Sequence, residues 1–127
     1  DKDQEAIIFA QKNTTDKKIL FIVSDLFQKI SGQFDLIICN PPYLPSHPKH
    51  KDPALDGGKH GYEWILLFLK QALNFLKQKG IILLLFSTLS HKEVIDTFLR
   101  QHHLSFEPIK KQKLAFEILY VYKIWRT

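Results

Sequence analysis

An apolar run stops abruptly at an asparagine, two prolines and a tyrosine, and these four residues have the chemistry of a binding site. Residues 34–39 are mostly apolar and predict a buried strand of a parallel sheet; the chain then continues with Asn40, Pro41, Pro42 and Tyr43. Proline has no N–H to donate, so the strand must end before it. Ligands of open α/β sheets bind just beyond the carboxyl ends of strands, which makes this turn the best candidate for a site.

The turn is suited to hold a flat nitrogen group. Proline restricts both itself and the residue before it, so the carbonyl groups of the turn point in nearly fixed directions. The side-chain oxygen of Asn40 and the carbonyl of Pro41 can together accept both hydrogens of a planar NH2 group, while Tyr43 can lie against its face. Such bonds raise the electron density on the nitrogen and hold it as it attacks an electrophile. The alternative is structural, because Asn-Pro and Pro-Pro pairs also simply end strands.

A second motif, Leu-Asp-Gly-Gly-Lys-His-Gly, occupies residues 55–61 before a predicted helix. Its glycines permit positive φ angles and a close backbone approach to substrate, although taken alone the motif also suits an ordinary loop that leads into a helix. The two motifs together resemble the class I S-adenosylmethionine-dependent methyltransferases that modify planar NH2 groups, and within them the HemK-like release-factor glutamine methyltransferases. The short spacer between the motifs and the late segment 116–122 are similar to the archaeal and eukaryotic-type branch.

The resemblance implies transfer of a methyl group from S-adenosylmethionine to the glutamine side-chain amide of the Gly-Gly-Gln motif in a peptide-release factor. The implied catalytic residues are Asn40 and Pro41, and the implied substrate-binding residues are Asn40, Pro41, Pro42 and Tyr43. The implied cofactor-binding residues are Asp1 for the ribose hydroxyls, Asp25 for the adenine amino group, Leu26 and Phe27 beside the adenine ring, and Asn40. Asp1 could instead be a helix-capping acid, and Asp25 part of a plain Ser-Asp turn. The implied partners are the release factor and a small zinc-binding activator subunit.

Two other functions remain open. Adenine N6 and guanine N2 amines in RNA or DNA present the same two hydrogens, so a nucleic-acid methyltransferase is one alternative. The net charge of +5 also favours proximity to RNA or the ribosome, although a lysine-rich composition explains it equally well. The other alternative is an inactive fragment or interaction module, because the chain has no Gly-x-Gly segment of the kind that receives the cofactor in the family.

The apolar periodicity places the motifs on an alternation of helices and strands. Helices are expected over 1–13 with Asp3 as N-cap, over 62–78 with Gly80 as C-cap, and over 91–102 behind a Ser90 cap. Strands are expected over 19–23, 34–39, 81–86, 104–109 and 115–125, and a hairpin loop over 110–113. The predicted fold class is α/β: the C-terminal portion of a Rossmann-like class I methyltransferase fold, with a mostly parallel sheet and an antiparallel C-terminal strand.

Residues 1–127 are expected to form a single, partial methyltransferase catalytic domain. By resemblance, the chain starts just after the second strand of the family's sheet, and we interpret it as part of a longer protein. The two preceding strands of the family separate the strand over 19–23 from the strand over 34–39. The first of these would therefore have no neighbour here and would expose its edge unless another polypeptide covers it.

Composition excludes several classes of protein. With 45% hydrophobic residues the chain can bury a core, and its longest apolar runs fall well short of the roughly 20 residues that span a bilayer, so no membrane segment is expected. The single cysteine, Cys39, excludes an internal disulfide, fits a cytoplasmic location and is expected to fill the core. No cysteine accompanies His47, His50 and His60 in their loop, so no metal site is expected.

Overall fold

The computed structural model describes all 127 residues, which divide into two compact units. The first comprises Asp1–Gly32 and the second Gln33–Thr127. None of the helices is long and apolar enough to cross a lipid bilayer.

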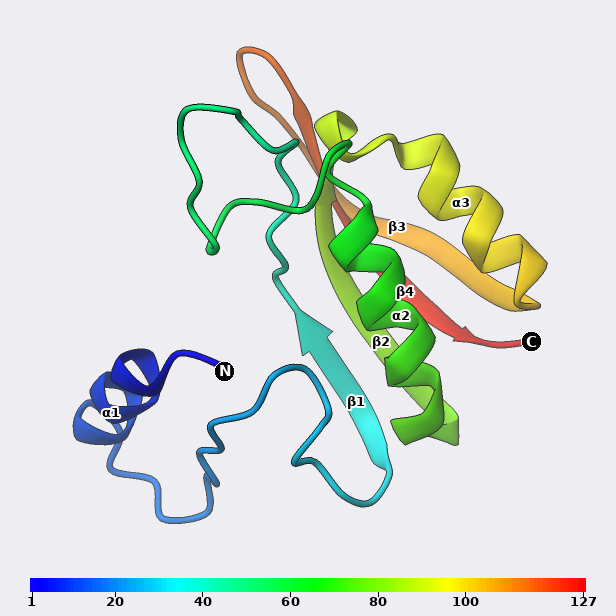
Figure 1. Cartoon of the computed structure of the whole chain (residues 1–127). Helices are drawn as coiled ribbons and strands as arrows, with labels where there is room; N and C mark the ends of the chain where they lie inside the picture. The colour runs from blue at the N-terminus through cyan, green and yellow to red at the C-terminus, as the bar shows by residue number, and fades with distance from the viewer. The chain divides into compact units, whose positions relative to one another are not determined.

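The first unit contains one helix, α1 (Gln4–Lys12), and an irregular return segment (Figure 1). Asp3 is its N-cap as predicted, because the carboxylate accepts hydrogen bonds from the backbone N–H groups of Glu5 and Ala6 at 2.8 and 3.4 Å. The strand expected over 19–23 is wrong: these residues have no strand assignment, and Leu20 is 81% exposed. A β-rich sequence becomes a strand only when a neighbouring strand accepts its backbone bonds, and no such neighbour is present in this unit.

The second unit is a four-stranded sheet with the strand order β1-β2-β4-β3. The strands are β1 (Phe34–Cys39), β2 (Leu76–Ser87), β3 (Leu104–Lys113) and β4 (Ile118–Arg126). β1 pairs with β2 in parallel, whereas β4 is antiparallel to both β2 and β3. The α/β class and the antiparallel C-terminal strand are therefore confirmed, and the parallel part of the sheet is limited in this chain to the β1–β2 pair.

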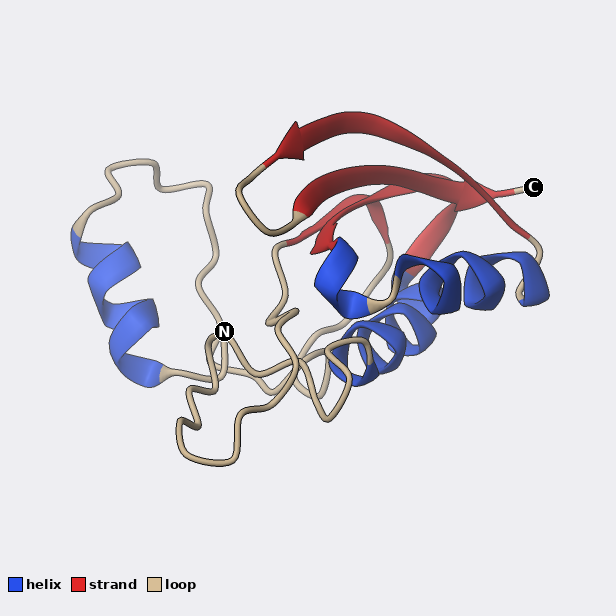
Figure 2. Cartoon of the chain, turned by 90° about the horizontal axis from the view of Figure 1, so that it is seen from above, coloured by secondary structure: helices blue, strands red, loops and turns tan.

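Two helices, α2 (Glu63–Phe75) and α3 (Lys92–Gln101), lie on one face of this sheet (Figure 2). The core lies between these two helices and the sheet. Alternate residues of a strand point to the same face, so every second side chain of a strand can enter this core. The fully buried side chains of this layer include Ile82, Leu84 and Phe86 from β2, Tyr122 and Ile124 from β4, Ile65 and Leu69 from α2, and Ile95 and Leu99 from α3.

A buried ionic cluster fastens α3 to β4. Asp96 is 7% exposed and accepts hydrogen bonds from the Tyr122 hydroxyl at 2.8 Å and from the Lys92 ammonium at 2.5 Å. A buried carboxylate is tolerated only when its oxygens have such partners. The cluster therefore fixes the position of α3 on the sheet.

Two predicted caps are wrong for the same reason, namely a tertiary contact that sequence spacing does not reveal. α2 ends at Phe75 and Gly80 lies inside β2, where a Cβ atom would come 2.9 Å from the Phe34 carbonyl oxygen. Glycine is thus required there for the close approach of β1. Ser90 ends a single 3-10 turn, η1 (Thr88–Ser90), and His91, with φ of 53°, is the residue that precedes α3.

The hairpin loop lies at residues 114–117 instead of the predicted 110–113. β3 continues through the lysines to Lys113, and the Leu114 N–H then donates to the Glu117 carbonyl at 2.8 Å to close the turn. β3 is an edge strand, and lysines are well suited to an edge because they need no burial and discourage pairing with other chains. Lys110, Lys111 and Lys113 therefore belong to a strand, although a lysine-rich composition alone favours a loop.

Three connecting segments meet at one edge of the sheet. β1 and β2 are parallel, so the turn after Cys39 and the turn after Ser87 leave from the same edge. Ser87 pairs with Leu119, and Lys113 pairs with Ile118, which brings the β3–β4 turn to this edge as well. Figure 1 shows all three segments at the end of the sheet to which β1 points.

Candidate active site

The Asn-Pro-Pro-Tyr turn begins directly after β1, as the sequence predicted. The predicted burial of this strand is wrong, because only Ile37 is buried and Ile38 is 69% exposed. Asn40 is exposed, Pro41 is buried, and Pro42 and Tyr43 are half-buried. The prolines thus anchor the turn in the unit while the Asn40 side chain remains accessible. This combination places an accessible side-chain amide at the carboxyl edge of the sheet, where a ligand can reach it.

The glycine motif lies directly on this turn. A Cβ atom on Gly57 would come 2.8 Å from the Pro42 carbonyl oxygen, and a Cβ atom on Gly61 would come 2.7 Å from the Tyr43 carbonyl oxygen. Gly58 and Gly61 have φ angles of +106° and +87°, so the predicted positive φ angles are confirmed at these two positions. The glycines therefore let the backbone of residues 57–61 pass close to the Asn-Pro-Pro-Tyr turn. This backbone confines the carbonyl groups of the turn.

Backbone hydrogen bonds hold the loop between the two motifs in register. The Leu44 N–H donates to the Leu55 carbonyl at 3.0 Å, and the Gly57 N–H donates to the Leu44 carbonyl at 2.8 Å. The Ser46 N–H donates to the Gly58 carbonyl at 2.9 Å. The segment after Tyr43 therefore runs beside the glycine motif and is tied to it at several points.

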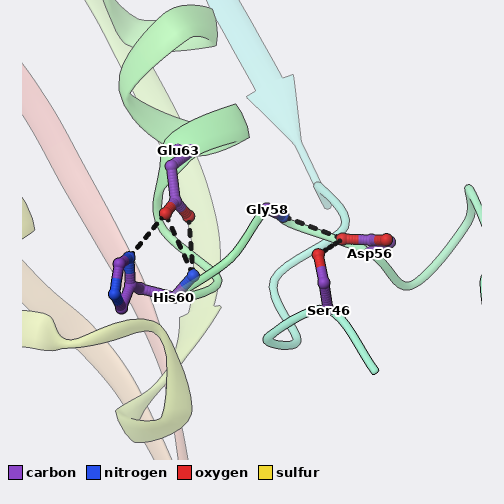
Figure 3. Close-up of polar contacts among 5 residues, drawn as sticks. All are labelled: Ser46, Asp56, Gly58, His60 and Glu63. Carbon is purple, nitrogen blue, oxygen red and sulfur yellow. Dashed lines mark hydrogen bonds and ion pairs between the residues drawn. The ribbon is translucent and has the colours of Figure 1, made fainter. Parts of the chain in front are cut away.

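Two carboxylates complete the support of the loop (Figure 3). Asp56 accepts hydrogen bonds from the Ser46 hydroxyl and from the Gly58 N–H, the latter at 3.0 Å. The bond from Ser46 is the main reason that the pKa of Asp56 is lowered. Glu63, the first residue of α2, reaches back to the His60 N–H at 3.0 Å, and its Oε1 lies 2.8 Å from His60 Nδ1. The acids thus fix the backbone on both sides of the motif, as capping carboxylates do at helix starts.

A serine from another connection also holds the turn. Ser90 is fully buried, and its hydroxyl donates to the Tyr43 carbonyl at 2.7 Å. The position of Ser90 before a helix predicts a capping role, and no local pattern reveals a partner 47 positions earlier. The Tyr43 carbonyl is therefore held from one side by Ser90 and confined on another by Gly61.

Tyr43 has an acidic neighbour that the sequence did not reveal. Burial raises the pKa of the Tyr43 phenol, and the negative charge of Glu117 raises it further. Glu117 belongs to the β3–β4 turn at the same sheet edge. In the sequence, the only indication of a special role for Glu117 is that it is the one charged residue in the otherwise apolar segment 116–122.

Cys39 offers no nucleophile to this site. It is the last residue of β1, and burial raises the pKa of its thiol to about 12. A thiol with such a pKa is almost entirely protonated at neutral pH and reacts poorly. The expectation that Cys39 fills the core is in accord with this environment.

The four residues with expected cofactor roles besides Asn40 all lie in the first unit. The Asp1 amino group donates to the Ile22 carbonyl at 3.1 Å, and the Ser24 N–H donates to the Asp1 carbonyl at 2.8 Å. These bonds bring Asp1 beside the segment that leads to the exposed Asp25. Leu26, with φ of 48°, and Phe27 follow in a turn and are half-buried. The unit thus gathers two carboxylates and two apolar side chains in neighbouring segments.

The loop histidines have other contacts. The His47 and His50 rings stack with their centroids 5.2 Å apart, and His60 pairs with Glu63. No group of three or more His, Cys, Asp or Glu side chains is placed to hold a metal ion. A mostly apolar hollow of about 210 Å³ lies within the loop and is lined by residues between Leu44 and Asp56.

Comparison with known proteins identifies the family. The model of the Eco57I restriction-modification methylase family matches residues 1–106. The chain belongs to this methylase family. A relative from Methanocaldococcus jannaschii, assigned by name as a protein N5-glutamine methyltransferase, is 34% identical over 95% of this chain and 65% of its own length. The release factor glutamine methyltransferase of Agrobacterium fabrum is 37% identical over 58% of this chain and 29% of its own length. The resemblance to HemK-like glutamine methyltransferases is thus confirmed.

Solved structures show the class I methyltransferase fold. The Mtq2–Trm112 complex of E. cuniculi, described as responsible for methylation of the eRF1 translation termination factor, matches with a TM-score of 0.73 and 23% identity over 94% of this chain and 68% of that chain. A ribosomal protein L11 methylase from Lactobacillus delbrueckii subsp. bulgaricus matches with a TM-score of 0.63 and 20% identity over 100% of this chain and 55% of that chain. The chain spans less than two thirds of the length of the curated relatives described above.

Proposed function

We propose that the protein transfers a methyl group from S-adenosylmethionine to the side-chain amide nitrogen of the glutamine in the Gly-Gly-Gln motif of a peptide-release factor. The observation that carries this proposal is the exposed Asn40 side chain, held at the carboxyl end of β1 by a buried proline and a braced turn. Relatives named as glutamine methyltransferases support the choice of an amide nitrogen. Cytoplasmic location is part of the proposal, since peptide release takes place there.

Each residue of the turn has a distinct role in this mechanism. The Asn40 side-chain oxygen and the Pro41 carbonyl each accept a hydrogen bond from one of the two N–H groups of the glutamine amide. Pro42 fixes the direction of the turn, and Tyr43 packs against the flat face of the amide. With both hydrogens engaged, the nitrogen is aligned and its electron density is raised. The nitrogen gains a bond to the methyl carbon and gives up one of its two protons to water, so catalysis depends on alignment and charge stabilisation without a covalent intermediate.

The first unit is chemically suited to the cofactor. Exposed carboxylates can accept hydrogen bonds from ribose hydroxyls and an adenine amino group, and we propose Asp1 and Asp25 for these roles. Leu26 and Phe27 would flank the adenine ring. S-adenosylmethionine, when bound, supplies a methyl group on a sulfonium that leaves as a neutral thioether.

A second chain is also part of this proposal. Residues 19–23 belong to no strand, and Ile19 and Leu20 are exposed, so this part of the segment can accept a strand from another polypeptide. The complex of two chains among the structural matches supports a small activator subunit, which we propose to bind zinc. The basic edge formed by Lys110, Lys111 and Lys113 is our candidate for contact with RNA or the ribosome.

Methylation of adenine N6 or guanine N2 is a second candidate. The family that matches the chain is described as a restriction-modification methylase, and such amines offer the same two hydrogens to Asn40 and Pro41. The two candidates are separated by incubating the whole protein and labelled S-adenosylmethionine with release factor alone and with nucleic acid alone. Label in the glutamine of the release factor supports the first candidate, and label only in nucleic acid supports the second.

An Asn40→Ala variant tests the role of the turn. We expect methyl transfer to fall about 100-fold or more, because one of the two acceptors that orient the amide is lost. The unfolding midpoint should be unchanged because Asn40 is exposed. Asn74→Ala, at an exposed position of α2, is the matched control and should keep full activity. Wild-type turnover in Asn40→Ala would refute the assignment, and the absence of any cofactor-induced thermal shift in the whole protein would favour an inactive module.

A further inference from the structure

A mostly apolar hollow follows the Asn-Pro-Pro-Tyr turn along the chain. It measures about 210 Å³ and lies in the second unit, within the loop that joins this turn to the glycine motif. Pockets that enclose a whole small molecule or cofactor are usually larger, at roughly 300–1,000 Å³. The hollow therefore has the size for one side chain and not for a complete cofactor.

The polar side chains in the wall of this hollow are engaged with the loop itself. The Asp52 carboxylate accepts a hydrogen bond from the Ala54 N–H at 2.9 Å. The Asp56 carboxylate accepts one from the Ser46 hydroxyl. His47 Nδ1 accepts one from the backbone N–H two residues later at 3.2 Å. These bonds stabilise the wall and occupy polar groups that could otherwise bind a polar ligand.

The apolar part of the lining is open to solvent. It comes from Leu44, Pro45 and Leu55. The Leu55 side chain is 51% exposed, and Pro45 is exposed as well. Apolar surface in a concave site gains free energy when a partner covers it and removes it from water. The chemistry of the hollow thus favours an apolar occupant.

The hollow is continuous with the turn that we propose to bind the substrate. Leu44 directly follows Tyr43. Its N–H donates to the Leu55 carbonyl at 3.0 Å, and its carbonyl accepts from the Gly57 N–H at 2.8 Å. Leu44 lies four positions after Asn40, and four residues span at most about 14 Å. An extended substrate chain covers the same distance in about four residues, so a side chain that close to a glutamine bound at Asn40 can reach the hollow.

We propose that this hollow binds an apolar side chain of the substrate polypeptide, at a position within about four residues of the methylated glutamine. This inference rests on the proposed function and specifies its substrate class. Asn40 and Pro41 would hold the amide, whereas the hollow would select the sequence around it. A nucleotide next to a target base brings a sugar and a charged phosphate, and neither is favoured in a mostly apolar hollow.

A set of peptides that contain Gly-Gly-Gln tests the hollow. Each peptide carries a single leucine at one position, up to about four residues from the glutamine, in a background of alanine and serine. Peptide KM and kcat of the whole protein are measured for each peptide, together with the KM for S-adenosylmethionine. At one position, leucine should lower the peptide KM about 10-fold relative to alanine, because its additional carbons leave water. The KM for S-adenosylmethionine should not change.

Two leucine variants of the protein locate this preference. Leu55→Ala should reduce the preference for leucine to about twofold or less, because part of the apolar wall is lost. Leu67→Ala is the matched control: Leu67 lies on α2 outside the hollow, and its side chain is 48% exposed. It should keep the 10-fold preference. Both variants should have the same unfolding midpoint, since the two side chains are similarly exposed.

The possible outcomes are distinct. If the wild type is active but prefers leucine at no position, or methylates the release factor but none of the peptides, this inference is overturned and the proposed function stands. A preference that survives in Leu55→Ala overturns it too, because another surface then binds the leucine. Loss of the preference together with a lower unfolding midpoint and a raised cofactor KM shows a structural role and also overturns it. If the wild type methylates only nucleic acid, or nothing, the proposed function fails and this inference fails with it.

Discussion

Replacement of Gly61 by alanine tests whether the glycine motif sets the shape of the Asn-Pro-Pro-Tyr turn. Gly61 has φ of +87°, and an added methyl group would lie 2.7 Å from the Tyr43 carbonyl oxygen. That oxygen is also the acceptor of the Ser90 hydroxyl at 2.7 Å. Because both act on one carbonyl group, Gly61→Ala should displace the acceptor that Ser90 binds.

Two contributions determine how much Gly61→Ala should lower the free energy of unfolding. Alanine in the left-handed region costs about 1–2 kcal/mol. Loss of the hydrogen bond from Ser90 costs about 0.5–1.5 kcal/mol more, because a buried hydroxyl loses its acceptor. The free energy of unfolding should therefore fall by about 1.5–3.5 kcal/mol in Gly61→Ala, and by about 1 kcal/mol in Ser90→Ala alone.

A double-mutant cycle isolates the shared carbonyl. Unfolding in urea can be followed by the fluorescence of Trp64 and Trp125, the two tryptophans of the chain, both of which lie in the second unit. In the Gly61→Ala background, Ser90→Ala should cost almost nothing, which corresponds to a coupling energy of about 1 kcal/mol. Additive losses would refute the reasoning. Gly32→Ala, with φ of +85° and no atom within 4 Å of the added methyl group, adds backbone strain without a clash and should not impair methyl transfer.

Three further predictions concern the supporting groups. Tyr122→Phe should lower the free energy of unfolding by about 2 kcal/mol in urea titrations, since Asp96 loses a hydrogen bond at 2.8 Å; an unchanged midpoint would show that the cluster does not hold α3. Because the pKa of Asp56 is lowered in the folded loop, its stabilising effect is present at neutral pH and is lost as the pH falls below about 3.8 and through the lowered value. The protection of the Gly58 amide against exchange, relative to its intrinsic exchange rate at each pH, should therefore fall in acid, and Asp56→Asn should remove this dependence on pH; the same acid transition in both proteins would contradict it. Cys39, with a thiol pKa raised to about 12, should resist alkylation at pH 8 until the protein unfolds, and rapid labelling of the native protein would count against its burial.

The sequence predicted those features that depend on neighbours along the chain. The strand before Asn40, the Asp3 cap and the positive φ angles of the glycine motif follow from local rules about proline, capping acids and glycine. The predictions for Gly80 and for residues 19–23 failed because each depends on a partner strand: one is present beside Gly80, and none is present beside 19–23 in its own unit.

The contacts that complete the site could not be predicted in this way. Ser90 reaches a carbonyl 47 positions away, and Glu117 approaches Tyr43 through the pairing of β3 with β4. A single sequence contains no record of which distant backbone groups will meet. The residue types were visible, but their partners were set by the register of the sheet.

The bracing of the Tyr43 carbonyl has a consequence for how such a motif can be transplanted. The tetrapeptide does not carry its own geometry, because part of it is imposed by Gly61 and by Ser90, which arrive from different connections. An isolated peptide, or a loop graft of Asn-Pro-Pro-Tyr into a foreign scaffold, would present the same atoms without their mutual orientation. Transfer of this binding turn to another protein must therefore include the carboxyl end of the sheet, together with the two connections that carry Gly61 and Ser90.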